Sequence, residues 1–342
     1  MIMRNDDCVA TVENSVITSC QEDAPILIKN GRFEDWKRIR TQDLNRPNSR
    51  ALRRLLGLST SNPQDVLPAI YYQSLSDAFW MKAADDAAAW ADIQFKDDRF
   101  FKIALTGKNH FANPAIFQQV QSPEHSNTGS FEKGWKLAGG KWQLWKAGSA
   151  EAVWSEVFYS NLANLIIPGC AVKYWCEDGY SVCDNFIDRD GGECLELFFS
   201  LHDDHSDSKT ALRLLPEAVH DEYRDMLFLD ALMYNWDRHE FNFGLVTKAG
   251  ERRVRLQPYY DFNLALFNGA TPGVERFEDA TIKMFATVGT RIPAVTADMV
   301  ETAYLQTKTS FLSPSVVVAS PGETVDFIMS SYRLICRALQ GI

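Results

Sequence analysis

Asp237, Asn242 and Asp261 are the residues whose types and spacing could do chemistry. Phosphoryl transfer needs a carboxylate that orients and deprotonates the acceptor hydroxyl. It also needs hard oxygen ligands for the Mg²⁺ ions that bridge nucleotide phosphates. Two aspartates and an asparagine supply both kinds of group. The alternative is that Asp237 and Asn242 only stabilise a turn, which both residue types do well.

The elements around these residues are predicted to bring them together. Residues 226–234 are almost all apolar and contain no Gly or Pro, so they predict a buried helix that leads into the first loop. A strand over 243–246, a polar turn over 248–251 and a strand over 254–256 predict a hairpin that leads to the second aspartate. We therefore expect the three side chains to meet at one end of a two-stranded unit.

A longer motif contains all three residues and reads Asn235-x-Asp237-x-His239-x-x-Asn242, followed by Pro258-x-Tyr260-Asp261. It resembles the catalytic and metal-binding segments of the HipA-type serine/threonine kinases. Its first part, with Arg238, is also similar to the catalytic loop of phosphatidylinositol-type kinases. Both groups have a protein-kinase-like fold and use ATP and Mg²⁺, and the resemblance implies the same here.

The resemblance also implies a role for each residue of the motif. Asp237 is expected to be the catalytic base, Asn242 and Asp261 the metal ligands, and His239 a residue that orients the loop through hydrogen bonds. Asp261-Phe262-Asn263 stands where many kinases have Asp-Phe-Gly. The missing glycine restricts the conformations open to this segment but keeps the carboxylate.

A polar loop with glycines precedes a predicted strand and is the candidate phosphate-binding loop. Gly129 and Gly134 have the spacing of a Walker A motif, but Trp135 and Lys136 follow where that motif needs Lys and Ser or Thr. Taken alone, the loop predicts only a hairpin. It resembles the phosphate-binding loop of HipA-type kinases, where a serine is autophosphorylated in some members, here Ser130. The resemblance assigns nucleotide binding to Asn127, Thr128, Gly129, Ser130, Phe131 and Lys133.

Lys146 ends the predicted strand after this loop, and the resemblance implies that it contacts the nucleotide phosphates. A helix predicted over 150–167 then carries two candidate carboxylate partners, Glu151 and Glu156. Glu151 lies in the first turn, where it suits the helix dipole. Glu156 lies mid-helix beside apolar residues and needs a partner there, so we favour it as the partner of Lys146.

Strands predicted over 171–175 and 180–186 follow the helix, around a turn that contains Gly179. In the kinase fold the segment after these strands is the hinge whose backbone binds adenine. The resemblance therefore implies that Asn185 and Phe186 contribute to nucleotide binding.

Composition limits the class of protein. The chain has 342 residues, is 46% hydrophobic and 23% charged, and lacks an apolar run of about 20 residues, which is typical of a globular protein without a membrane span. A net charge of −10 argues against direct nucleic-acid binding. The seven cysteines lack metal-site spacing, and reduced thiols in a cytoplasmic protein are expected.

The charge is unevenly distributed, because residues 29–54 contain nine basic and three acidic side chains. Two interpretations remain open: a docking surface for an acidic or antitoxin-like partner, or the solvated face of two helices, which we prefer. Helices are predicted over 49–56, 64–74, from about Thr296, and from Ser320 to Leu339, the last with a capping box.

We predict an α+β, bilobal protein-kinase-like fold. Residues 1–112 form a helical extension packed on the kinase core, 113–190 a mixed α/β nucleotide-binding N-lobe, and 191–342 a mainly helical catalytic C-lobe. The expected activity is a HipA-like, toxin–antitoxin-type protein kinase that phosphorylates Ser or Thr. A lipid, inositol or other small-molecule kinase and a non-catalytic pseudokinase are the alternatives.

Overall fold

The computed structural model of the chain contains two compact units. Unit 1 comprises Met1–Ala147, Asn185–Glu196 and Val246–Arg253, and unit 2 comprises Gly148–Asp184, Leu197–Leu245 and Val254–Ile342. The structure describes residues 1–41, 48–55, 62–108, 121–127, 131–204, 207–251, 253–268, 270–271, 276–311 and 318–341.

The predicted α+β class is confirmed, because strands and short helices make up unit 1 while long helices dominate unit 2. The units divide the chain differently from the three predicted segments. Residues 148–184 of the predicted N-lobe belong to unit 2, together with the Asp237 and Asp261 segments.

Unit 1 begins with an antiparallel sheet, so the prediction that 1–112 is helical is wrong for its start. The strand order is β3-β2-β1-β4, and Asn14 and Ser15 connect β2 to β3 with φ of 50° and 63°. Two consecutive residues of positive φ make the turn that suits a two-residue hairpin. The sequence signal was present as β-branched runs on both sides of Asn14. The strands are β1 Ile2–Arg4, β2 Asp7–Glu13, β3 Val16–Cys20 and β4 Phe79–Met81.

Short helices connect the strands of unit 1. The helix predicted from residue 49 is present as α3, but 64–74 forms two 3-10 helices, Pro63–Val66 and Pro68–Ile70, instead of one α-helix. Pro68 explains the break, because proline lacks the N–H that an uninterrupted helix needs. The α-helices are α1 Ile26–Lys29, α2 Phe33–Arg38, α3 Ser49–Leu55, α4 Trp90–Ile93 and α5 Phe101–Thr106.

The strand predicted to end at Lys146 is confirmed in unit 1. Strand β5 (Lys133–Ala138) pairs antiparallel with β6 (Lys141–Lys146), and Gly139 and Gly140 form the turn with φ of 57° and 80°. In this register Lys133 lies directly opposite Lys146. A short 3-10 helix, Pro123–Ser126, precedes the hairpin.

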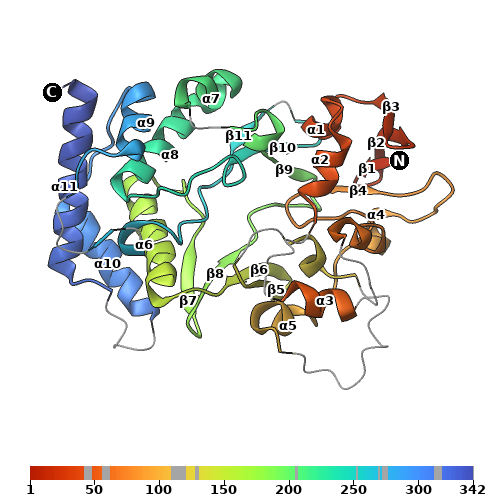
Figure 1. Cartoon of the computed structure of the whole chain (residues 1–342), viewed down its shortest axis with the longest axis horizontal. Helices are drawn as coiled ribbons and strands as arrows, with labels where there is room; N and C mark the ends of the chain where they lie inside the picture. Colours follow the sequence, from red (N-terminus) through yellow and green to blue (C-terminus); the bar gives the residue numbers. More distant parts are fainter. Residues whose placement is uncertain are drawn as a thin grey trace. The chain divides into compact units, whose positions relative to one another are not determined.

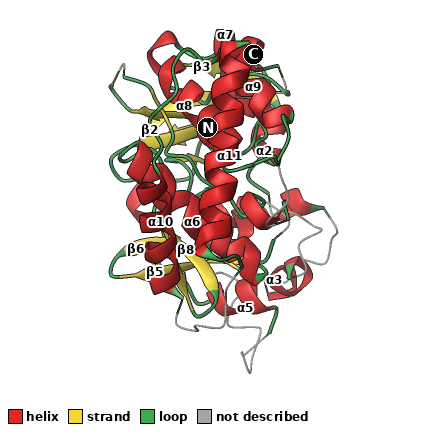
Figure 2. Cartoon of the chain, turned by 90° about the vertical axis from the view of Figure 1, so that its left-hand side faces the viewer, coloured by secondary structure: helices red, strands yellow, loops and turns green. Residues whose placement is uncertain are grey.

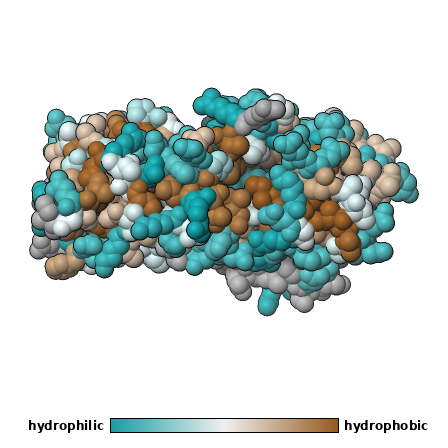
Figure 3. Space-filling view, turned by 90° about the horizontal axis from the view of Figure 1, so that it is seen from above, coloured by the Kyte–Doolittle hydropathy of each residue, from teal (hydrophilic) through white to brown (hydrophobic). Residues whose placement is uncertain are grey.

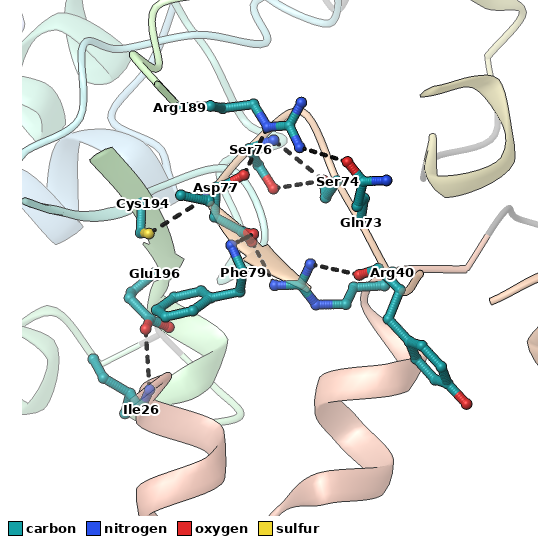
Figure 4. A network of polar contacts seen from close by, with 12 residues as sticks. Ile26, Arg40, Gln73, Ser74, Ser76, Asp77, Phe79, Arg189, Cys194 and Glu196 are labelled. Carbon is teal, nitrogen blue, oxygen red and sulfur yellow. Dashed lines mark hydrogen bonds and ion pairs between the residues drawn. The ribbon is translucent and has the colours of Figure 1, made fainter. Parts of the chain in front are cut away.

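A buried polar network holds distant segments of unit 1 together (Figure 4). Arg40 Nη2 lies 2.5 Å from Asp77 Oδ2, and Arg189 Nε donates to the backbone oxygen of Asp77 at 2.8 Å. Glu196 Oε1 accepts the backbone N–H of Ile26 at 3.0 Å. Burial raises the pKa of Glu196 to about 7, in spite of that hydrogen bond. Charged groups buried in this way are tolerated because each has a partner.

Unit 2 is built on helix α6 (Ala150–Ile166), which confirms the predicted helix over 150–167. Ser149 accepts a hydrogen bond from Ala152 N at its start, and the chain leaves the helix before Pro168. The hairpin of β7 (Tyr174–Glu177) and β8 (Tyr180–Asp184) follows, with Gly179 in its turn. Tyr174 N donates to Ser160 Oγ at 3.0 Å, so this hairpin is fastened to α6.

The remaining helices of unit 2 pack on one another (Figures 1 and 2). Helices α9 and α11 contact α8 and each other, and α10 contacts both α6 and α11. The predicted capping box of the last helix is present, with Ser320 and Glu323 hydrogen-bonded reciprocally. The helices are α7 Ser208–Leu214, α8 His220–Leu232, α9 Ala280–Val288, α10 Ala297–Ser310 and α11 Pro321–Gln340.

Three strands lie at or near the boundaries between the units. Strands β9 (Glu193–Leu197) and β10 (Gly244–Lys248) each contain residues of both units, and β11 (Arg255–Leu256) follows in unit 2. Within unit 2, Gln257 N donates to Gly244 O at 3.1 Å and Gly244 N donates to Gln257 Oε1 at 2.6 Å. The chain therefore returns beside Gly244 shortly before it reaches Asp261.

Hydrophilic residues cover much of the face shown in Figure 3, with hydrophobic residues reaching the surface between them. Among the described residues, the large exposed hydrophobic side chains are Val16, Phe131, Leu214, Trp236, Phe277 and Leu305. None of the helices in the described part of the chain has the length and apolar character needed to cross a membrane.

Candidate active site

The Asp237 loop begins where helix α8 ends. The helix stops at Leu232, and Met233 N still donates to Leu229 O. Tyr234 then adopts a left-handed backbone conformation with φ of 52°, and Asn235 N donates back to Asp230 O at 2.9 Å. This tight turn points the chain out of the helix within two residues. The position of the loop is therefore determined by the end of a buried helix.

Hydrogen bonds close the loop between Asp237 and Asn242. Asn242 Nδ2 donates to Asp237 O at 2.9 Å, and Asn242 N donates to His239 O at 2.8 Å. The His239 ring accepts from Phe241 N through Nδ1 at 3.2 Å. His239 thus contributes both its backbone and its ring to the shape of the loop. Its role in a catalytic site stays a prediction.

Arg238, between Asp237 and His239, points into the interior and forms a two-pronged contact with Asp230. Its Nε lies 2.8 Å from Asp230 Oδ2 and its Nη2 lies 3.0 Å from Asp230 Oδ1. Both side chains are 3% exposed, so this is a buried ion pair. Asp230 also accepts from Tyr159 Oη at 2.8 Å and from Asn235 Nδ2 at 2.7 Å. The carboxylate is therefore held by four donors.

The third guanidinium nitrogen joins the two segments that carry the predicted metal ligands. Arg238 Nη1 donates to Asn242 O at 2.9 Å and to Tyr260 O at 3.0 Å. Tyr260 directly precedes Asp261, and its hydroxyl donates to Phe241 O at 3.2 Å. The backbone at Asn242 and the backbone that enters Asp261 therefore converge on one nitrogen atom.

Asp261 has a left-handed backbone with φ of 65°, which is uncommon for a residue other than glycine. The next residue, Phe262, is fully buried and stacks on Tyr159 with ring centroids 3.7 Å apart. Asn268 Nδ2 donates to Asn263 O at 2.6 Å, just beyond the stack. Packing on both sides of Asp261 thus maintains a conformation that an isolated peptide would rarely adopt.

Electrostatics reinforce this arrangement. Burial by itself lowers the pKa of Arg238, but the Asp230 carboxylate outweighs it and the net pKa is raised. Burial raises the pKa of Tyr174, and the charges of Cys183, Glu156 and Asp261 raise it further, whereas a backbone hydrogen bond with Asp261 lowers it. Asp261 therefore acts on this buried phenol in two opposing ways.

Glu156, the predicted partner of Lys146, is buried in α6 and accepts a hydrogen bond from Ser181 Oγ. Lys146 is buried at the end of β6 in unit 1, whereas Glu156 belongs to unit 2. Their pairing stays a prediction.

The predicted nucleotide-binding residues that the structure describes lie in unit 1. Asn127 is buried and donates through Nδ2 to Glu124 Oε2 at 3.4 Å, whereas Phe131 is 40% exposed. Asn185 N donates to Trp142 O at 2.7 Å and its Nδ2 to Leu75 O at 3.0 Å, immediately before Phe186. Thr128, Gly129 and Ser130 lie outside the described residues.

The donor set of the loop fits a divalent cation such as Mg²⁺. Asn242 uses Nδ2 for the Asp237 carbonyl, which leaves Oδ1 as the amide atom that can ligate a cation. Asp261 adds a carboxylate from the adjoining segment, and both are the hard oxygen ligands that Mg²⁺ prefers. In the described part of the chain, no three His, Cys, Asp or Glu side chains cluster as a metal site of their own.

Several residues that build this site have no obvious motif in the sequence. Asp230, Tyr159 and Tyr174 lie in or beside predicted apolar elements and were not assigned a role. A polar residue within an apolar helix is a usable signal, because a buried carboxylate requires partners. Asp230 met that criterion in the sequence, but its partner Arg238 could be identified only from the structure.

No protein-family model and no curated protein matches this chain. Several solved structures resemble it in fold, and two of them illustrate the similarity. One is the Helicobacter pylori proinflammatory kinase CtkA, with 14% identity, 61% of this chain and 94% of that chain covered, and a TM-score of 0.45. The other is a chain from the complex of the Shewanella oneidensis MR-1 toxin–antitoxin system HipA, HipB and its operator DNA. It has 10% identity, covers 99% of this chain and 96% of its own, and has a TM-score of 0.48.

Proposed function

We propose that this chain is an ATP- and Mg²⁺-dependent phosphotransferase, a HipA-like kinase that phosphorylates serine or threonine in a protein. The observation that carries the proposal is the contact of Arg238 Nη1 with both Asn242 O and Tyr260 O. This contact joins the loop of Asp237 and Asn242 to the segment of Asp261, the order of residues that the sequence motif shares with HipA-type kinases.

Each residue of the site has a distinct role in the proposed reaction. Asp237 accepts a hydrogen bond from the acceptor hydroxyl and takes its proton as the phosphoryl group is transferred. Asn242 and Asp261 hold the cation through oxygen atoms. Mg²⁺, when bound, neutralises charge on the nucleotide phosphates. His239 and Arg238 keep the loop in the required conformation.

Unit 1 is proposed to contribute the nucleotide-binding residues. Lys146 contacts the phosphates and the loop from Asn127 to Lys133 surrounds them, with Ser130 as the candidate autophosphorylation site. A thermal-shift assay with Mg·ATP tests this part. Stabilisation that requires both nucleotide and metal supports it, and unchanged melting at saturating Mg·ATP would support a non-catalytic pseudokinase instead.

The acceptor class is the second part of the proposal. The similarity of the Asp237-Arg238-His239 run to phosphatidylinositol-type kinases keeps a lipid, inositol or other small-molecule acceptor as the alternative. Radiolabelled ATP offered in parallel to protein, lipid and sugar acceptors separates the two classes. Label transfer to lipid or sugar but not to protein would overturn the protein-kinase assignment.

An antitoxin-like or acidic partner was the other expectation for the basic segment 29–54. Arg32 and Arg38 pair with Asp35, Lys37 pairs with Glu34, and Arg40 pairs with Asp77. These internal ion pairs reduce the positive charge available to a partner. For these four basic residues they favour the helix-face interpretation, and a partner for the segment stays a prediction.

A further inference from the structure

Arg238 divides its donors between one carboxylate and two backbone carbonyls. Nε and Nη2 face Asp230, and Nη1 faces Asn242 O and Tyr260 O. The planar guanidinium fixes the angle between these directions, so the carboxylate on one side determines where the two carbonyls lie on the other. A lysine ammonium has its three donors on a single nitrogen and cannot reproduce this geometry.

The positions of the two carbonyls restrain the backbone of the two proposed metal ligands, Asn242 and Asp261. A peptide unit is planar, so fixing Tyr260 O also fixes the N–Cα bond of Asp261. Fixing Asn242 O likewise restrains the backbone from which the Asn242 amide projects. Asp261 has a left-handed φ of 65°, which is unfavourable for a residue other than glycine. Without the hydrogen bond to Tyr260 O, its backbone would relax to a more favourable conformation and its carboxylate would move.

We propose that Arg238 is a positioning residue that sets the separation of Asn242 and Asp261, and thereby the affinity of the site for its divalent cation, and that Asp230 holds Arg238 in place. The proposal rests on the phosphotransferase function proposed above. It identifies the residues that hold the two metal ligands at the correct separation. Partners that orient metal ligands without touching the metal affect affinity by about 10- to 100-fold.

A purely structural role is the competing explanation, and the chain offers a matched control. Arg40 is a buried arginine of unit 1, paired with Asp77 at 2.5 Å. It donates through Nη1 to Tyr72 O at 3.0 Å, so it connects the end of helix α2 to the segment before β4. Its hydrogen-bond partners do not include the Asn242 or Tyr260 carbonyls. Replacing it should cost stability without altering metal affinity.

The test is direct binding of Mn²⁺, an EPR-visible substitute for Mg²⁺, to the full chain with a non-hydrolysable ATP analogue. Arg238→Lys is expected to weaken Mn²⁺ binding by about 10-fold or more, and Asp230→Asn to weaken it in the same direction. Arg40→Lys is expected to lower the melting temperature but to bind Mn²⁺ as the wild type does. Tyr159→Phe, which removes one of the four donors to Asp230, provides a mild variant with an expected few-fold loss of affinity.

The outcomes separate this proposal from the function on which it rests. Wild-type protein that binds no Mn²⁺ with the nucleotide analogue contradicts the phosphotransferase proposal itself and this inference with it. Wild-type binding with unchanged affinity in folded Arg238→Lys overturns only the inference. Equal losses in Arg40→Lys and Arg238→Lys also overturn it, because the effect would then be general destabilisation. If Arg238→Lys does not fold, unchanged affinity in Tyr159→Phe decides against the proposal.

Discussion

The two units each contain a buried arginine–aspartate pair, and the pairs differ in how completely the arginine is satisfied. In unit 2 Arg238 uses Nε and Nη2 on Asp230 and Nη1 on two carbonyls. In unit 1 Arg40 contacts Asp77 through Nη2 and Tyr72 O through Nη1. Its Nε is buried without a hydrogen-bond partner among the described residues.

The difference lies in what each arginine holds. The Arg40 guanidinium carbon lies 4.2 Å from the centroid of the Trp36 ring, and Arg40 connects helix α2 to the segment before β4. The Arg40–Asp77 pair is therefore part of the scaffold of unit 1. Arg238 connects two loops that carry the proposed chemical groups. A guanidinium with a hydrogen-bond partner at each of its three nitrogens leaves little freedom to its neighbours, and precise placement matters most where ligands must meet a cation. We therefore expect stability effects from the first pair, and stability and binding effects from the second.

The largest expected effect comes from Asp237, the proposed catalytic base beside Arg238. Asp237→Ala should lower kcat by about 10²- to 10⁴-fold, the usual contribution of a positioned base, because the acceptor hydroxyl would lose its proton acceptor. The affinity for Mg·ATP should change little, since the metal ligands remain. Steady-state kinetics with a protein acceptor measure both quantities, and full phosphotransfer by the variant would show that the base is wrongly assigned.

The comparison of the two pairs is sharpened by Asp77→Asn and Asp230→Asn. Each leaves a buried guanidinium without its counter-charge and should lower the free energy of unfolding by about 3–5 kcal/mol. Urea unfolding followed by circular dichroism measures the loss. Mn²⁺ binding should weaken in Asp230→Asn and stay unchanged in folded Asp77→Asn. Equal losses of Mn²⁺ affinity in the two variants would contradict the claim that only the Arg238–Asp230 pair affects metal binding.

The smallest expected effect is the pH dependence that Glu196 adds to unit 1. Its pKa in the folded chain is about 7, above its ordinary value of 4.5, because burial disfavours the charged form. Because this pKa is raised, the contribution of Glu196 to the free energy of unfolding is complete below about pH 4.5. It is lost as the pH rises to about 7, which lowers the free energy of unfolding by about 3 kcal/mol in total. Glu196→Gln should remove this part of the slope. Identical slopes of unfolding free energy against pH in the two proteins would contradict the assignment.

Local signals allowed much of the fold to be predicted from the sequence. The capping box at Ser320 and the glycine turn at Gly179 depend on neighbouring residues alone, and both are confirmed. The helix predicted over 64–74 is wrong because Pro68 divides the segment into two 3-10 helices. The strands around Asn14 were missed, although their turn residue and β-branched runs were visible.

The site was predictable only in part. The spacing of Asp237, Asn242 and Asp261 identified the loops, because that motif is local. The residues that position these loops could not be inferred, since Tyr159 and Asp230 are far apart in the sequence and meet only when α6 and α8 pack. Tertiary contacts of this kind have no periodicity or motif that a single sequence displays.

A double-mutant cycle on metal binding tests the central claim, that Asn242 and Asp261 converge on one divalent cation. Isothermal titration would measure Mn²⁺ affinity, with the non-hydrolysable ATP analogue present, for wild type, Asn242→Ala, Asp261→Ala and the double variant. We predict that each single change weakens binding about 10-fold or more and that the double variant departs from the product of the two effects by a coupling above about 1 kcal/mol. Independent, multiplicative effects, or unchanged affinity in either single variant, would contradict the account.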